Sequence, residues 1–127
     1  MKSKKAIVMS IKPKYAEMIY SGKKKWEFRK KAPPVEVPIL IYESAPVSKV
    51  TGVVVFALEI RASPPLLWLQ VKNPQWEETG TGISRAELDA YAGGQPVSAL
   101  RVLTADRLDR PFRLSNPPQN WGSFWLV

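Results

Sequence analysis

The sequence contains no cysteine and no histidine among its 127 residues. Without cysteine there can be no disulfide, no thiolate nucleophile and no cysteine-bound zinc. Without histidine the chain lacks the most usual general base and the most usual zinc ligand, so any chemistry must use lysine, tyrosine, hydroxyl or carboxylate side chains. We therefore expect neither a metal site nor another cofactor.

Long apolar runs are also missing. No stretch approaches the ~20 apolar residues that span a bilayer. The apolar run behind the basic N-terminus stops at Ser10, which is too short for a signal peptide. We expect a soluble, cytoplasmic protein with no membrane partner. At this length, and with 45% hydrophobic residues, residues 1–127 are interpreted as a single domain, a monomer by default.

Acidic residues are scarce in the first quarter of the chain. Residues 1–31 hold 11 Lys or Arg and 2 Glu, a net of +9, whereas residues 32–127 hold 8 Lys or Arg and 9 Asp or Glu, a net of −1. This asymmetry favours a polyanionic partner. Nucleic acid is favoured over a membrane surface because no long basic amphipathic helix is present. A basic surface that only keeps the protein soluble is the alternative.

Hydrophobic periodicity predicts short strands around a few short helices. Strands are expected at residues 6–11, from residue 25, at 39–44 and 49–62, in one or two pieces at 97–114, and at the C-terminus. Helices are expected after Pro13, within residues 64–74, and between Ser84 and Gly93. Ser84 and Glu87 form a capping box, and Gly52 is expected at a bulge or bend. The predicted class is α+β, with a small, barrel-like mixed sheet and two or three short helices.

The basic stretch Ser21–Lys31 contains two aromatic residues and one carboxylate. A period-two pattern places Trp26 and Phe28 on one face of a strand, and the charged residues Glu27 and Arg29 then lie on the other. The aromatic residues indicate a half-buried strand and not a disordered basic arm. On these residues alone, Glu27 belongs to a solvated charge ladder, worth ~0.2–1 kcal/mol per cross-strand pair.

Polar residues near the ends of neighbouring strands suggest a binding site as a second interpretation. Gly22 ends the preceding helix, and backbone can approach a ligand closely at a glycine. The nearby donors suit a nucleotide or a modified base. These candidates are Ser10, Lys12, Tyr42 and Ser44.

The segment GKKKWEFR matches the G-x-K-x-x-E-x-R signature of the ASCH family, a branch of the PUA-like superfamily. Gly22, Lys24, Glu27 and Arg29 occupy the four signature positions. MSIKPKYAEMIYSGKK resembles the family's opening, ILIYESAPVSKVTGVVVF its next strands, and PPQNWGSFWLV its closing turn and strand. The resemblance covers most of the chain and is weakest across residues 66–105.

The resemblance implies a PUA-like β-barrel in which the signature lines a cleft for RNA or a nucleotide. Lys24, Glu27 and Arg29 are then cleft residues. Strict alternation would put Lys24 on the face of Trp26. Either the turn after Gly22 resets the alternation, or Lys24 lies at the mouth of the cleft.

The first implied function is a binding module for RNA or a nucleotide, which could carry a modified base; single-stranded DNA is the alternative ligand. Lys12, Lys24 and Arg29 would contact phosphates. Glu27 would accept hydrogen bonds from a base or a sugar hydroxyl, and Tyr42 would stack on a base for ~1–3 kcal/mol.

The second implied function is a small metal-independent enzyme. Some ASCH-like proteins are N4-acetylcytidine amidohydrolases. They have a threonine nucleophile where this chain has Glu27, and a further glutamate at a place that falls near Thr81 in this chain. This chain therefore departs from the amidohydrolases at both positions. Others are ribonucleases, for which Lys24, Glu27 and Tyr42 would be catalytic. The ordinary lysine pKa of ~10.4 would then have to be lowered. The third function is a protein-interaction domain in transcription or translation regulation.

The remaining aromatic and acidic residues receive structural interpretations. Four tryptophans are expected to pack in the core or against the sheet rather than stack on bases; they are Trp68, Trp76, Trp121 and Trp125. Glu77 and Glu78 lie near the place of the amidohydrolase glutamate but lack the spacing of a metal cluster.

Overall fold

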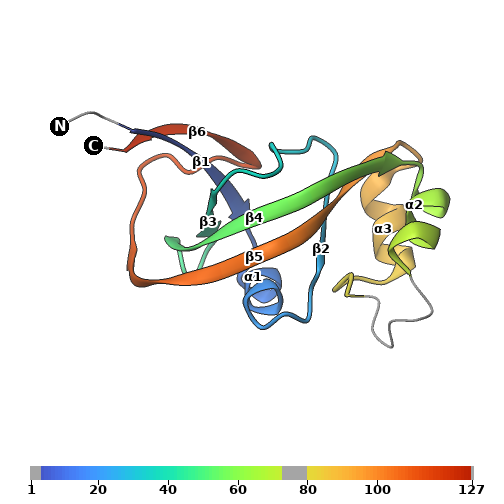
Figure 1. Cartoon of the computed structure of the whole chain (residues 1–127), viewed down its shortest axis with the longest axis horizontal. Coiled ribbons are helices and arrows are strands. Elements are labelled where there is room, and N and C mark those ends of the chain that lie inside the picture. Colours follow the sequence, from blue (N-terminus) through green and yellow to red (C-terminus); the bar gives the residue numbers. More distant parts are fainter. Residues whose placement is uncertain (1–3, 73–79, 127) are drawn as a thin grey trace.

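The computed structural model describes residues 4–72 and 80–126 (Figure 1). Within these ranges the chain forms six strands and three helices, in the order β1 (Lys4–Ile11), α1 (Pro13–Tyr20), β2 (Trp26–Arg29), β3 (Ile39–Glu43), β4 (Lys49–Ala62), α2 (Pro64–Val71), α3 (Arg85–Ala92), β5 (Val97–Phe112) and β6 (Trp121–Leu126). The predicted α+β class, with three short helices, is confirmed.

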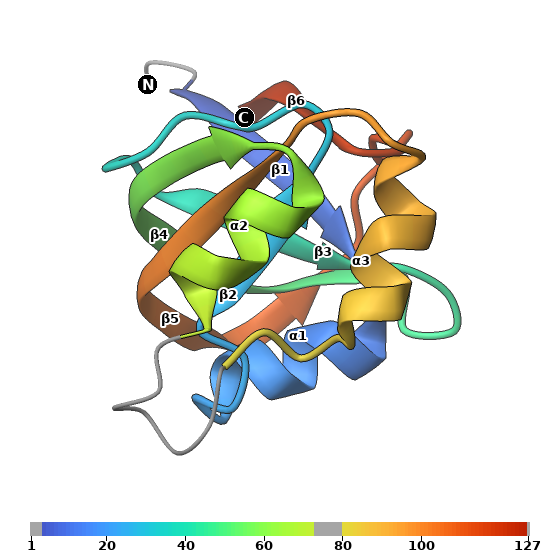
Figure 2. The same ribbon diagram turned by 90° about the vertical axis from the view of Figure 1, so that its right-hand side faces the viewer.

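The six strands form one mixed sheet in the order β2-β5-β4-β3-β1-β6. Only the β1–β3 pair is parallel among these strand pairings; the others are antiparallel. β2 and β6 are the edge strands, so within residues 4–72 and 80–126 strand pairing does not close the sheet into the barrel that the sequence predicted. The sheet instead curls strongly, as Figure 2 shows. The long β4 and β5 pair through several register irregularities, which increase local twist.

Gly52 lies at one of these irregularities, as predicted. A Cβ at this position would lie 2.2 Å from the hydroxyl oxygen of Tyr20 and 2.5 Å from the carbonyl oxygen of Asp106. Only glycine allows α1 to approach β4 this closely. The Tyr20 hydroxyl shares a 2.8 Å hydrogen bond with Thr51, and burial raises the pKa of Tyr20.

Apolar side chains form a core on each side of β1. The largest cluster packs α1 against one face of the sheet and includes Ile19 and Phe56. A second cluster lies beneath α2 and α3 and contains the buried Phe28, with Trp26 packed against it. Trp26 and Phe28 therefore share the face that their alternation predicts. A smaller third cluster contains Val8, whose neighbour Met9 belongs to the largest cluster.

The tryptophan predictions have mixed outcomes. Trp68 packs against the cluster beneath α2 and α3, and Trp121 packs against the largest cluster. Trp125 is 65% exposed, so the prediction that it packs in the core or against the sheet is wrong. It lies near the last residue of β6, where the facing strand contributes Lys5 rather than an apolar residue. Trp76, Glu77 and Glu78 lie outside the described residues. No helix in the described ranges is long and apolar enough to cross a membrane.

Candidate functional site

In the part of the chain that the structure describes, side chains and not strand hydrogen bonds join the two edges of the curled sheet. Arg29 on β2 donates from Nη2 to the carbonyl oxygen of Ser10 on β1 at 2.9 Å, and from Nη1 to Oδ1 of Asn120, just before β6, at 2.6 Å. Trp121 on β6 donates from Nε1 to the carbonyl oxygen of Lys31 at 3.2 Å. We call this junction the seam. The signature residue Arg29 is thus a structural clamp between β2 and the opposite edge.

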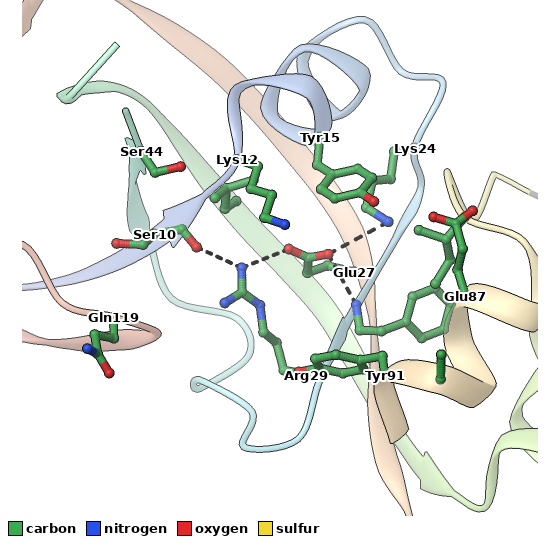
Figure 3. Close-up of a pocket in the computed structure, with 14 residues that line it drawn as sticks. Ser10, Lys12, Tyr15, Lys24, Glu27, Arg29, Ser44, Glu87, Tyr91 and Gln119 are labelled. Atoms are coloured by element: carbon green, nitrogen blue, oxygen red, sulfur yellow. Dashed lines mark hydrogen bonds and ion pairs between the residues drawn. The ribbon is translucent and has the colours of Figure 1, made fainter. Parts of the chain in front are cut away.

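A pocket of about 560 Å³ opens at the seam. Its walls come from the end of β1, the start of α1, β2 and one face of α3 (Figure 3). Six of the residues proposed from the sequence line it together: Ser10, Lys12, Lys24, Glu27, Arg29 and Ser44.

Gly22 and Tyr42 are not among the lining residues. Gly22 has a φ of +83°, and an added Cβ would meet nothing within 4 Å, so the turn after α1 requires glycine for its backbone angle and not for space. Tyr42 is 8% exposed and packs with Val8 and Val50 in the third apolar cluster. The fold therefore brings six of the candidates to one pocket and leaves these two outside it.

The Glu27 carboxylate lies between two cations in the pocket wall. Its Oε2 is 2.9 Å from Nη2 of Arg29, and its Oε1 is 3.7 Å from Nζ of Lys24. Oε1 also accepts the backbone N–H of Phe28 at 3.2 Å. Only 9% of the Glu27 side chain is exposed. The prediction from the residues alone, a solvated charge ladder, is therefore wrong, because folding places Glu27 in the pocket wall between Lys24 and Arg29.

Lys24 is a buried amine in the same wall. It precedes the first residue of β2, so the turn after Gly22 resets the alternation and both Lys24 and Glu27 face the pocket. Nζ donates to the carbonyl oxygen of Thr81 at 2.5 Å. It also lies 5.3 Å from the ring centroid of Tyr15. Burial lowers the pKa of Lys24, and the nearby Glu27 carboxylate opposes this shift only in part.

Four polar lining residues were not proposed from the sequence: Tyr15, Glu87, Tyr91 and Gln119. Glu87, Ala90 and Tyr91 occupy helical positions i, i+3 and i+4, so they share one face of α3. That spacing is a signal that could have indicated a pocket-facing stripe. Tyr15, on α1, lines the pocket and also packs against the largest apolar cluster.

Glu87 caps the start of α3 and also lines the pocket. As the predicted capping box requires, its Oε1 accepts the backbone N–H of Ser84 at 3.0 Å, and its own N–H donates to Oγ of Ser84 at 3.1 Å. The backbone hydrogen bond from Ser84 lowers the pKa of Glu87. The start of α3 thereby holds a second carboxylate at the pocket.

The pocket combines aromatic rings with nearly balanced charge. Lys12, Lys24 and Arg29 contribute three positive charges, and Glu27 and Glu87 contribute two negative charges, so the lining charges sum to +1. Within residues 4–72 and 80–126, no group of three or more acidic, histidine or cysteine residues could hold a metal ion. Such a lining suits an aromatic group with polar edges better than a compact polyanion.

Residues 9–92 match the sequence model of the ASCH domain. The chain belongs to the ASCH domain family. This ASCH protein is 27% identical over 125 residues to an "ASCH domain-containing ribonuclease" of Zymomonas mobilis, an alignment that covers 92% of this chain and 82% of the relative.

Solved structures agree with the family. The crystal structure of ASCH from Zymomonas mobilis superposes with a TM-score of 0.78 at 25% identity, covering 96% of this chain and 87% of the other. A tyrosine-to-phenylalanine mutant of the same protein has a TM-score of 0.76, also at 25% identity, over 98% of this chain and 91% of the other. The predicted family membership is confirmed.

Proposed function

We propose that this ASCH domain binds single-stranded RNA and holds one nucleotide in the pocket around Lys24, Glu27 and Arg29. The observation that carries the proposal is the Glu27 carboxylate, a buried acceptor fixed in a pocket wall between two cations. The pocket volume of about 560 Å³ lies within the range typical of small-molecule sites.

Each part of a nucleotide has a suitable partner in the lining. Glu27 can accept a hydrogen bond from a base amino group or a sugar hydroxyl, since a carboxylate offers about four acceptor positions. The rings of Tyr15 and Tyr91 offer π-faces for a base. Lys12 is exposed at the pocket, where it can meet a phosphate. Lys24 and Arg29, whose side chains are 1% and 13% exposed, are better placed to orient Glu27 than to neutralise phosphates.

The name of the Zymomonas mobilis relative supports RNA over DNA as the ligand class. It also motivates a second candidate function, cleavage of the bound RNA. The specific observation behind this candidate is the lowered pKa of Lys24, because burial increases the fraction of neutral amine near neutral pH.

In the cleavage reaction, neutral Lys24 would take the proton of a ribose 2′-hydroxyl. The 2′ oxygen would then bond to the adjacent phosphorus, and the bond from phosphorus to the 5′ oxygen would break. The leaving 5′ oxygen would receive a proton from Tyr15, whose ring centroid is 5.3 Å from Nζ of Lys24. The products are a 2′,3′-cyclic phosphate and a 5′-hydroxyl. Tyr42 has no part in this scheme because it does not line the pocket.

The test compares Lys24→Met with Lys23→Met. Both substitutions remove one positive charge from adjacent positions, but Lys24 is buried in the pocket wall and Lys23 is exposed outside it. Both variants and the wild type are titrated with short single-stranded RNA, with matched DNA and with a panel of free and modified nucleosides. The same mixtures are analysed for products, and circular dichroism checks the fold.

We expect wild type and Lys23→Met to bind alike and Lys24→Met to bind at least about tenfold more weakly, a difference of ~1.4 kcal/mol. Products that form with wild type and Lys23→Met but not with Lys24→Met would establish cleavage. Equal losses in the two variants would contradict the pocket proposal, because they would mean that only surface charge matters. Weak, salt-sensitive binding to any polyanion would instead favour a protein-docking module.

A further inference from the structure

We propose that the pocket is the beginning of a longer track for single-stranded nucleic acid, which leaves the pocket at Tyr91 and continues over Trp121 and Trp125. The inference rests on the proposed function, because it extends the ligand from one nucleotide to a strand of several. A lysine ammonium lies over each of the three rings: Lys30 over Tyr91, Lys31 over Trp121 and Lys5 over Trp125.

The first ring of the track stands at the edge of the pocket. Tyr91 lines the pocket and is 40% exposed. Its hydroxyl accepts the backbone N–H of Lys30 at 3.0 Å, and the Lys30 ammonium lies 5.1 Å from its ring centroid. The hydrogen bond and the cation hold the ring in place. An exposed, immobilised ring beside a pocket is suited to stacking on the next base.

The second ring follows directly along the seam. Gln119 lines the pocket, Asn120 accepts from Arg29, and Trp121 donates to the carbonyl oxygen of Lys31 at 3.2 Å. The Lys31 ammonium lies 5.4 Å from the Trp121 ring centroid. Tyr91 is hydrogen-bonded to the backbone of Lys30 and Trp121 to the backbone of Lys31, the next residue, so these contacts place the second ring near the first.

The third ring lies farther along β6. Trp121 and Trp125 are four residues apart and therefore share one face of the strand, about 13 Å from each other. Lys5 is the cross-strand partner of Trp125, and its ammonium lies 5.7 Å from that ring centroid. Trp125 is 65% exposed. Trp121 packs partly against the largest apolar cluster on this face, whereas Trp125, farther along the edge strand β6, is exposed.

A repeated pairing of aromatic ring and lysine fits a nucleic-acid strand better than an acidic peptide. In a single strand each repeat carries a flat base and a phosphate, and here each repeat offers a ring and an ammonium. An acidic peptide would match the ammonium groups but has no regular π-face for the rings. A surface that only keeps the protein soluble would need the lysines alone, and an exposed Trp125 would not increase its solubility.

The test measures affinity as a function of ligand length. Wild type is titrated with nucleoside monophosphates and with RNA of three, six and nine nucleotides, alongside DNA of the same lengths and polyglutamate. The variants are Trp125→Ala and Lys31→Gln, which change side chains outside the pocket lining. Their matched controls are Leu69→Ala, at an apolar residue that is 70% exposed on α2, and Lys72→Gln, at an exposed lysine after α2.

We expect affinity for RNA to rise with length in wild type and in both controls. Trp125→Ala should bind the longest RNA about 5- to 150-fold more weakly, the contribution of one stacked base. Lys31→Gln should lower the salt dependence of its binding by about 0.7 in log–log slope, one phosphate contact to a single strand. Neither variant should change the affinity for a monophosphate.

Monophosphate binding with no gain from added length would overturn the track and leave the pocket proposal intact. A length gain that survives unchanged in both variants would also overturn it, as would polyglutamate binding as tight as RNA. Failure of every nucleotide and oligonucleotide to bind would instead refute the proposed function itself. DNA that gains equally with length would support the track and remove the preference for RNA.

Discussion

Replacing Glu27 with glutamine removes the negative charge between buried Lys24 and the largely covered Arg29, and it keeps the size of the side chain. The Lys24 and Arg29 side chains are 1% and 13% exposed, so neither can turn to solvent without moving the pocket wall. Removing one partner of a buried ion pair typically costs about 3–5 kcal/mol, because the remaining charge is left uncompensated. We expect Glu27→Gln to lower the free energy of unfolding by an amount in this range.

The matched control is Glu17→Gln. Glu17 also pairs with an arginine, Arg107, but these two side chains are 66% and 52% exposed. Exposed pairs contribute about 0–1 kcal/mol. The two glutamines therefore make the same chemical change and differ in burial. Urea denaturation followed by tryptophan fluorescence gives both free energies, and equal denaturant slopes would show that the unfolded states are comparable.

A double-mutant cycle identifies the cause of the loss. Adding Lys24→Met to Glu27→Gln removes one of the two uncompensated cations and keeps most of the apolar stem. The double variant should be more stable than the sum of the single changes predicts, with a coupling of about 0.5–3 kcal/mol. A Glu27→Gln loss no larger than that of Glu17→Gln, or strict additivity in the cycle, would refute the assignment of Glu27 as a buried counter-ion.

Three further predictions concern pH, packing and helix capping. Burial lowers the pKa of Lys24 in the folded state below its ordinary 10.5. Between the folded pKa and 10.5 the unfolded state therefore binds more protons, so the free energy of unfolding should rise with pH across that window. Lys24→Met should flatten this rise, which is measured as the urea midpoint at each pH. Gly52→Ala should lower the free energy of unfolding by about 1–3 kcal/mol through its clash with Tyr20 and the backbone of β5; Gly122→Ala, which meets only an ordinary contact at 3.4 Å, should be near neutral, and equal effects in the two variants would contradict the packing argument. Ser84→Ala should cost about 1 kcal/mol in thermal unfolding, whereas Ser63→Ala, at a helix start with no side-chain cap bond, should cost little; a silent Ser84→Ala would show that the capping box is dispensable.

The local elements could be predicted because their signals are local. Pro13 opens α1, Ser84 and Glu87 cap α3, and Gly93, with a φ of +59°, ends that helix. The alternation of Trp26 and Phe28 identified β2 and its apolar face. The signature spacing identified the family and three charged residues that line one pocket, Lys24 among them.

Long-range packing decided the rest. Tyr15, Tyr91 and Gln119 reach the pocket from α1, α3 and the chain before β6, and no local pattern sets the distance between those segments. Tyr42 was proposed for the site because it lies near a strand end, yet it is buried against Val8 in another apolar cluster. A period of two shows which side chains share a face but not which face meets the pocket.

The sequence by itself determined the α+β class, the family and the charges of the signature, since periodicity, caps and motif spacing are properties of neighbouring residues. Only the tertiary structure decided that the sheet curls without closing. It also decided that Arg29, on the edge strand β2, binds the Ser10 carbonyl oxygen and Asn120 at the opposite side of the sheet. It also decided that Glu27 is a buried carboxylate and not a solvated one. The physical reason is that burial, and with it the strength of charge interactions, depends on residues brought close by folding and not on those adjacent in the chain.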